Sequence, residues 1–203
     1  MRNVALKISL PVVAIALLAG CASGTPTATS APPSATPTAS STPTPEPTSS
    51  SGTGQVDPNA PDGQCADENL TVSVKPDEGG AAAGSIPYVI TFTNSGPECV
   101  LEGAPGVSIR GESDSVQIGE PAEQQGTAEP VTLAEGGTAI APLSAVNVGT
   151  TGGPLGDACK ATTGEGYRIY PPHSFEPVFV KSAGVAACSG SAVFLSVGVV
   201  AAG

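Results

Sequence analysis

The chain of 203 residues is 39% hydrophobic, which is enough for one domain of ordinary size with additional chain outside its core. Its single His excludes centres that take two imidazoles from one chain, such as blue-copper and superoxide-dismutase-like sites, and we expect no metal and no cofactor. After its first twenty residues the chain has five basic against eighteen acidic residues, a net charge of −13, which excludes nucleic acid as a partner and any charge-based attachment to anionic lipid.

Residues 1–20 have the organisation of a bacterial lipoprotein signal peptide. Arg2 and Lys7 give a positive start, and the eleven-residue apolar stretch 8–18 is far shorter than the ~20 residues that cross a bilayer. The segment ends in the lipobox-like sequence LAGC, in which the sulfur of Cys21 receives a diacylglycerol. Two acyl chains hold a protein firmly where one chain anchors it only marginally. We therefore expect a protein anchored by lipid to the outer face of the cytoplasmic membrane; a plain secretory peptide with a chance Cys is the alternative.

Residues 21–64, which begin with the lipidated Cys, are predicted to form a disordered stalk. Between 22 and 54 the chain has nine Thr, eight Ser and seven Pro and no large apolar residue, so it cannot bury enough surface to offset the entropy of ordering. A plain solvated linker and an O-glycosylated stalk both fit this composition. Residues 57–63 resemble a calcium loop only slightly, since Pro61 stands where an oxygen ligand is needed, and a turn-rich hinge is the better interpretation.

From Cys65 to the C-terminus, apolar residues recur at every second position, which predicts strands with one buried face. No segment in this part shows a sustained helical period with caps. About seven to nine short strands separated by turns predict an all-β fold, a β-sandwich domain over residues 65–203. The pattern is present at 70–75, 88–93, 107–109, 131–133, 138–148, 167–170, 178–180 and 193–200.

Four cysteines remain once Cys21 is assigned to lipid, and in an exported chain an even number indicates disulfides. Three pairings are possible, and we favour the two that join cysteines adjacent in the sequence. Each would close a loop of about 30 to 35 residues and stabilise the domain by roughly 3–4 kcal/mol. A zinc site is the alternative, but it calls for closely spaced Cys pairs, which are missing here. The favoured pairs are Cys65–Cys99 and Cys159–Cys188.

Two groups of residues are candidates for a catalytic or binding site. His173, in a Pro-rich loop, could in principle join Ser174 and an acid in a catalytic triad, but no G-x-S-x-G motif occurs and an exposed loop His is the alternative. Residues 112–129 contain five acids and no base, which fits either a solvated loop or an interaction face for a cationic partner. The five acids are Glu112, Asp114, Glu120, Glu123 and Glu129.

The sequence GPECVLEGAPGV at 96–107, together with Asn94 before it, combines an Asn-x-Gly turn, a Cys and a Pro-Gly corner at fixed spacing. It resembles the signature of exported actinobacterial proteins grouped as domain of unknown function 4232. The resemblance covers residues 65–200 and includes NLTV at 69–72, TFTN at 91–94 and PP at 171–172. It implies an immunoglobulin-like sandwich on a lipid anchor, and it implies no activity and no functional residues.

We therefore expect a lipid-anchored envelope protein that presents a non-enzymatic β-sandwich outside the cytoplasmic membrane and binds an envelope protein or glycan. Sandwich domains commonly use their loops for recognition, and the motifs of catalysis are missing from this sequence. Two alternatives stay open. One is an accessory lipoprotein of a membrane transporter or enzyme, and the other is an envelope hydrolase with two carboxylates about 5 to 9 Å apart in a cleft.

Overall fold

A computed structural model describes residues 57–79 and 84–203 of the chain. The predicted signal peptide, the lipid-bearing Cys21 and most of the predicted stalk lie outside the described residues. The described part is almost entirely β-structure, as the sequence predicts, with 3-10 helices η1 (Asp67–Asn69) and η2 (Gly153–Ala158) between strands. No helix in these two ranges is long and apolar enough to cross a bilayer. The strands are β1 (Leu70–Pro76), β2 (Ser85–Asn94), β3 (Cys99–Leu101), β4 (Gly106–Gly111), β5 (Val116–Ile118), β6 (Glu123–Gln125), β7 (Val131–Leu133), β8 (Thr138–Val146), β9 (Ala161–Tyr170), β10 (Val178–Cys188), β11 (Leu195–Gly198) and β12 (Ala201–Ala202).

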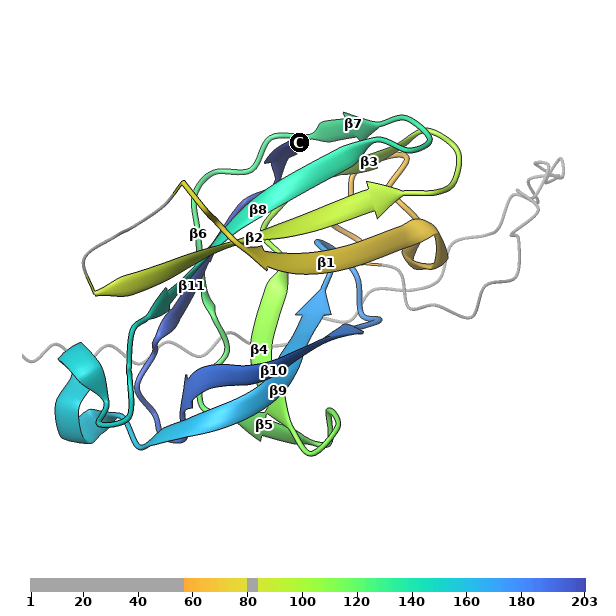
Figure 1. The fold of residues 1–203 in the computed structure, drawn as a ribbon. Helices are drawn as coiled ribbons and strands as arrows, with labels where there is room; N and C mark the ends of the chain where they lie inside the picture. The colour runs from red at the N-terminus through yellow and green to blue at the C-terminus, as the bar shows by residue number, and fades with distance from the viewer. Residues whose placement is uncertain (1–56, 80–83) are drawn as a thin grey trace, which may run out of the picture. The chain divides into compact units, whose positions relative to one another are not determined.

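Two sheets form the layers of a sandwich (Figure 1). The six-stranded sheet has the order β1-β2-β8-β11-β6, with β12 also paired to β8, and the four-stranded sheet has the order β10-β9-β4-β5. Strands β3 and β7 form a small third sheet. The strand pairs are antiparallel, apart from the parallel pair of β11 with β6. The predicted β-sandwich is therefore confirmed.

The core lies between the two sheets because apolar residues alternate along the strands. In β2, Ile90 and Phe92 are fully buried, whereas their neighbours Val89, Thr91 and Thr93 are only half-buried. Across the sandwich, Ile109 of β4 and Ile169 of β9 are also fully buried. The alternation in the sequence thus identifies the inward faces of the long strands correctly.

Several strands extend beyond the predicted segments. Strand β9 starts at Ala161 rather than near 167, and β10 continues to Cys188 rather than ending near 180. These additional residues are mostly small or polar, so they show no alternation of apolar side chains, but they pair with each other in one ladder. The segment 193–200 contributes β11, with β12 following it, and short β3, β5 and β6 were not predicted.

Both favoured disulfides are present. Cys65 is bonded to Cys99 with their Cα atoms 4.8 Å apart, and Cys159 is bonded to Cys188 with their Cα atoms 5.0 Å apart. The first ties the residues before η1 to the start of β3, and the second ties the end of η2 to the end of β10. The two bonds therefore fasten loops to strands at different places in the domain.

Candidate functional site

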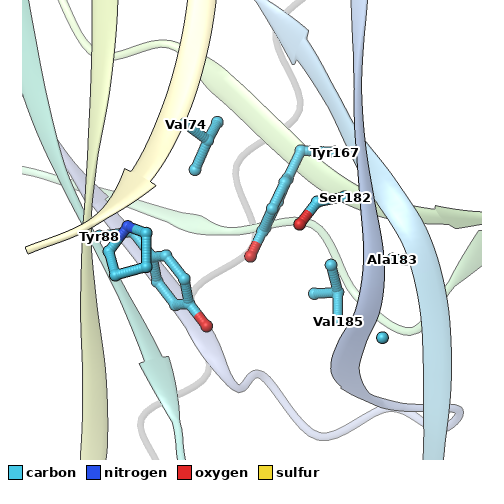
Figure 2. A pocket seen from close by; sticks show the side chains of 8 residues that line it. Val74, Tyr88, Tyr167, Ser182, Ala183 and Val185 are labelled. Atoms are coloured by element: carbon cyan, nitrogen blue, oxygen red, sulfur yellow. The ribbon is translucent and has the colours of Figure 1, made fainter.

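A pocket of about 190 Å³ lies where an outer strand of each sheet borders the space between the layers (Figure 2). Strands β1 and β10 are each the end member of their sheet, so no further strand of these sheets lies beyond them within the described residues. We call this space the tyrosine pocket. It is lined by Val74 and Pro76 of β1, Tyr88 of β2, Tyr167 of β9, and Ser182, Ala183, Gly184 and Val185 of β10.

A bulge in β10 forms one wall of the tyrosine pocket. Lys181 pairs with Gly166 and Val185 pairs with Gly164, so the three β10 residues 182–184 stand opposite a single residue of β9. Gly184 has φ +76°, a backbone conformation that side chains with a Cβ rarely adopt. Because residues 183 and 184 are exposed, the pocket is open to solvent on this side. The bulge in β10 therefore forms the rim of the tyrosine pocket.

Tyr88 and Tyr167 approach the pocket from opposite sheets. Their ring centroids are 6.1 Å apart and the ring planes are inclined at 59°. Burial raises the pKa of Tyr167 well above its ordinary value, and the neighbouring Tyr88 raises it further. Tyr167 is therefore a neutral phenol at any physiological pH, able both to donate and to accept a hydrogen bond. Figure 2 shows the hydroxyl of Tyr167 pointing into the space between Tyr88 and Ser182.

A second pocket of about 210 Å³ lies over β8 and β11. Among its lining residues, Asp77 is the one carboxylate, and it accepts a hydrogen bond from the backbone N–H of Gly79 at 3.0 Å. The lining of the tyrosine pocket has no carboxylate. Neither pocket thus brings together the two carboxylates that the hydrolase hypothesis calls for.

His173 is paired with an acid, whereas Ser174 is hydrogen-bonded to a different residue. Nδ1 of His173 lies 2.8 Å from Oδ2 of Asp57. The pKa of Asp57 is lowered, first by the backbone N–H of Asn59 and then by the hydrogen bond with His173. Ser174 instead exchanges hydrogen bonds with the backbone of Glu176. Within the described chain, the structure supplies the acid of a triad but no nucleophile from the adjacent Ser.

The contact of Asp57 with His173 also places the end of the predicted stalk against the domain. Gln64, the last predicted stalk residue, donates a side-chain hydrogen bond to the backbone oxygen of Pro172 at 3.0 Å. It also forms an isolated β-bridge with Val100. Residues 57–64 therefore pack against the loop after β9 and against β3.

The structure separates the five predicted acidic residues. The carboxylate of Asp114 is bound by Arg168 and Arg110, which lower its pKa; the Arg168 hydrogen bond has the largest effect. The other four are exposed and lie on different elements: Glu112 in the β4–β5 turn, Glu120 after β5, Glu123 in β6 and Glu129 before β7. An interaction face made of these four stays a prediction. No group of three His, Cys, Asp or Glu residues in 57–79 and 84–203 has the arrangement of a metal site.

A protein-family model described as "Domain of unknown function (DUF4232)" matches residues 65–200. The chain belongs to this family. The match begins at the first disulfide-bonded Cys and ends after β11, so it covers nearly all of the sandwich. No curated protein matched the chain, and no solved structure did.

One residue by which the sequence resembles DUF4232, Asn94, has a clear structural role. The side chain of Asn94 is fully buried, and its Nδ2 donates to the backbone oxygens of Pro97 at 2.8 Å and Leu133 at 3.1 Å. Its Oδ1 accepts the backbone N–H of Gly96 at 2.9 Å. The Asn-x-Gly element thus fastens the turn after β2 to the end of β7. Asn94 thus has a structural role, and none of the residues that carry the resemblance lines the tyrosine pocket.

Proposed function

We propose that this chain is a lipid-anchored cell-envelope protein whose β-sandwich acts as a non-enzymatic binding module outside the cytoplasmic membrane. The cysteines are the observation that carries this proposal. Two disulfides use four of the five cysteines, and the fifth, Cys21, is the residue at the end of the lipobox-like sequence. Disulfides persist in oxidising compartments, so their formation agrees with export across the membrane.

The tyrosine pocket supports binding rather than catalysis. It is lined by hydroxyl groups, apolar side chains and peptide backbone, and by no carboxylate, imidazole, amine or thiol. General acid–base chemistry near neutral pH most often uses groups of those types, and burial moves the pKa of Tyr167 away from that pH range. Concave sites with a few polar groups among apolar walls are typical of ligand binding.

Replacement of Cys21 tests the anchor. The wild-type protein is expected in the membrane fraction, with its N-terminal peptide carrying the mass of a diacylglyceryl group, and a Cys21→Ala variant is expected in the medium. A Ser23→Ala variant, changed two residues further along, should stay with the membrane as a matched control. Protease added to intact cells should remove the domain from the wild-type cells, which tests the orientation. An unmodified Cys21 thiol, or a Cys21→Ala protein that stays membrane-bound, would overturn the proposal.

Crosslinking in intact cells distinguishes a binding module from an accessory lipoprotein. A stoichiometric complex with one transporter or membrane enzyme would favour the accessory function. Crosslinks that depend on the rim of the tyrosine pocket, and that are lost in a Ser182→Ala variant, would favour the binding module.

A further inference from the structure

We infer that the tyrosine pocket binds one uncharged sugar unit. The inference deepens the proposed function and relies on it only for the source of the sugar, an envelope glycan. Side chains from both sheets reach into the same space: Val74 and Tyr88 from one, and Tyr167, Ser182 and Val185 from the other (Figure 2). The site is therefore built by the sandwich as a whole and not by one loop.

The charge of the lining determines the class of ligand. None of the eight lining residues carries an ionisable group that is charged near neutral pH. An anionic or cationic ligand would lose hydration in this pocket without gaining an ionic partner, which is costly. The basic residues nearest in sequence, Lys75 and Lys181, are exposed and are not part of the lining. A ligand without net charge is the one that this pocket can bind.

The mixture of hydroxyl groups and apolar walls points to a polyhydroxylated ring. The hydroxyls of the half-buried Tyr88 and Ser182 can each donate and accept a hydrogen bond, as sugar hydroxyls also do. The aromatic rings and the side chains of Val74 and Val185 offer apolar surface to the C–H groups of the same ring. A purely apolar ligand would displace water from the hydroxyls of Tyr88 and Ser182 without replacing its hydrogen bonds, at a cost in binding free energy.

The β10 bulge adds peptide groups to this set. Residues 182–184 have no partner in the ladder with β9, so their backbone N–H and C=O groups are free of that strand. A Cβ atom built on Gly184 would meet nothing within 4 Å, so the rim of the pocket is open at this residue. Backbone groups on a fixed bulge can thus bind ring hydroxyls at the mouth of the pocket.

The volume limits the ligand to about one ring. Pockets for drug-sized ligands measure roughly 300–1,000 Å³. The tyrosine pocket, at about 190 Å³, is smaller than these. We therefore expect it to hold one terminal sugar of a longer glycan, and to bind a free monosaccharide with a Kd of about 1 mM.

Tyrosine fluorescence gives a direct measurement of binding. The chain has no Trp and three Tyr, so two of its three fluorophores lie in the pocket. The full-length protein, purified in a detergent without a sugar head group, is titrated with the methyl glycosides of glucose, mannose, galactose and arabinose. At least one of these should give a saturable change in fluorescence. Methyl glucuronide, which is charged, should bind at least about tenfold more weakly than the best neutral sugar.

Matched variants identify the site. Tyr88→Phe and Ser182→Ala each remove one hydroxyl and leave the shape of the wall unchanged, and each should weaken binding about tenfold. Tyr170→Phe removes a hydroxyl on β9 outside the pocket and should bind like the wild type. Unfolding midpoints of all variants show that they are folded; calorimetry replaces fluorescence for Tyr88→Phe, which loses a fluorophore.

Three outcomes would overturn the inference. The first is a folded protein that shows no saturable signal with any of the four glycosides up to about 100 mM, a hundredfold above the expected Kd. The second is saturable binding of uncharged dipeptides with none of sugars, and the third is wild-type sugar affinity in both Tyr88→Phe and Ser182→Ala. These results do not depend on Cys21, so a failure of the sugar test leaves the anchor test unaffected, and the reverse also holds.

Discussion

Arg168 of β9 binds the carboxylate of Asp114 with two hydrogen bonds, from Nε to Oδ1 at 2.9 Å and from Nη2 to Oδ2 at 2.7 Å. Arg110 of β4 donates to the same carboxylate at 3.1 Å. Asp114 is the last of three consecutive residues with positive φ, after Glu112 at 48° and Ser113 at 55°. Such backbone conformations are costly for residues with a Cβ. The two guanidinium groups therefore hold a strained β4–β5 turn against the four-stranded sheet.

Neutralising Asp114 should destabilise the domain. An Asp114→Asn variant keeps the size of the side chain but loses the charge-assisted hydrogen bonds, and we expect a loss of about 1–3 kcal/mol in unfolding free energy. Urea unfolding followed by circular dichroism measures this. The control is Glu120→Gln, which neutralises an exposed acid of the same segment and should change stability by less than about 0.5 kcal/mol. Equal effects of the two substitutions would show that Asp114 does not hold the turn.

The contribution of Asp114 should disappear in acid. Its pKa in the folded protein is lowered, mainly by the hydrogen bond from Arg168, so the ionised carboxylate stabilises the fold above the unfolded-state pKa near 3.8. This stabilisation is lost as the pH falls from about 4 through the folded-state pKa. The wild type should therefore exceed Asp114→Asn by a constant margin between about pH 5 and 7, and the margin should shrink below about pH 4. Thermal midpoints across this range give the comparison, and a margin that stays constant down to pH 2 contradicts the assignment.

Even the conservative substitution of Asn94 by Asp should destabilise the domain. An Asn94→Asp substitution replaces an NH₂ group that faces the backbone oxygens of Pro97 and Leu133 with an oxygen, in a fully buried position. Two acceptors would lose their donor and a carboxyl group would be buried beside them, so we expect a loss of about 3 kcal/mol or more. Asn69→Asp, at a half-buried Asn beside the same turn, is the control and should cost less. Chemical unfolding of the two variants measures the difference.

The first disulfide should stabilise the domain because it closes a long loop of the chain. Cys65 and Cys99 are 34 residues apart, and replacing both by Ala is expected to lower unfolding free energy by about 3–4 kcal/mol. Replacing Cys99 alone should cost more and should also yield disulfide-linked dimers, since Cys65 would be left as a free thiol. Guanidinium unfolding and non-reducing electrophoresis provide the two measurements. A double variant as stable as the wild type would mean that the hydrogen bonds of residues 64–65 suffice to hold this end of the chain.

The sequence predicts which face of a strand is buried better than it predicts which residues of other strands that face contacts. The alternation at 88–93 places Tyr88 on the same face as Ile90 and Phe92, and the structure confirms this. The alternation in the sequence does not indicate that Tyr88 contacts Tyr167, because that contact depends on which sheet each strand joins. The sequence groups Asp114 with the acids close to it along the chain, whereas one of its two arginine partners, Arg168, is 54 residues away. Patterns of period two report the local environment of a residue and not its partners across the fold.

The β10 bulge shows a second limit. Residues 181–187 are KSAGVAA, and the side chains after Lys181 are mostly small and give no alternation. The sequence therefore predicts a strand that ends at 180, although the ladder continues to 188. The wall of the tyrosine pocket is formed within this segment. Gly184 was the one available signal, since an isolated Gly inside a strand often marks a bulge. Disulfide pairing was easier to predict, because each pair joins cysteines adjacent along the chain.

Tyr167 should ionise only at strongly alkaline pH. Burial raises its pKa above the ordinary value of 10, and because the neutral phenol is the form that the fold favours, its stabilising effect is present below pH 10 and is lost as the pH rises further. Phenolate absorbance measures this when the wild type is compared with Tyr167→Phe. At about pH 10 the two folded proteins should show equal phenolate absorbance, because Tyr167 contributes nothing. In denaturant at higher pH the signals should stand at three to two, the numbers of tyrosines in the two chains. An excess of wild-type absorbance at pH 10 in the folded state would mean that solvent reaches this hydroxyl freely, and that the phenol at the base of the tyrosine pocket is not desolvated.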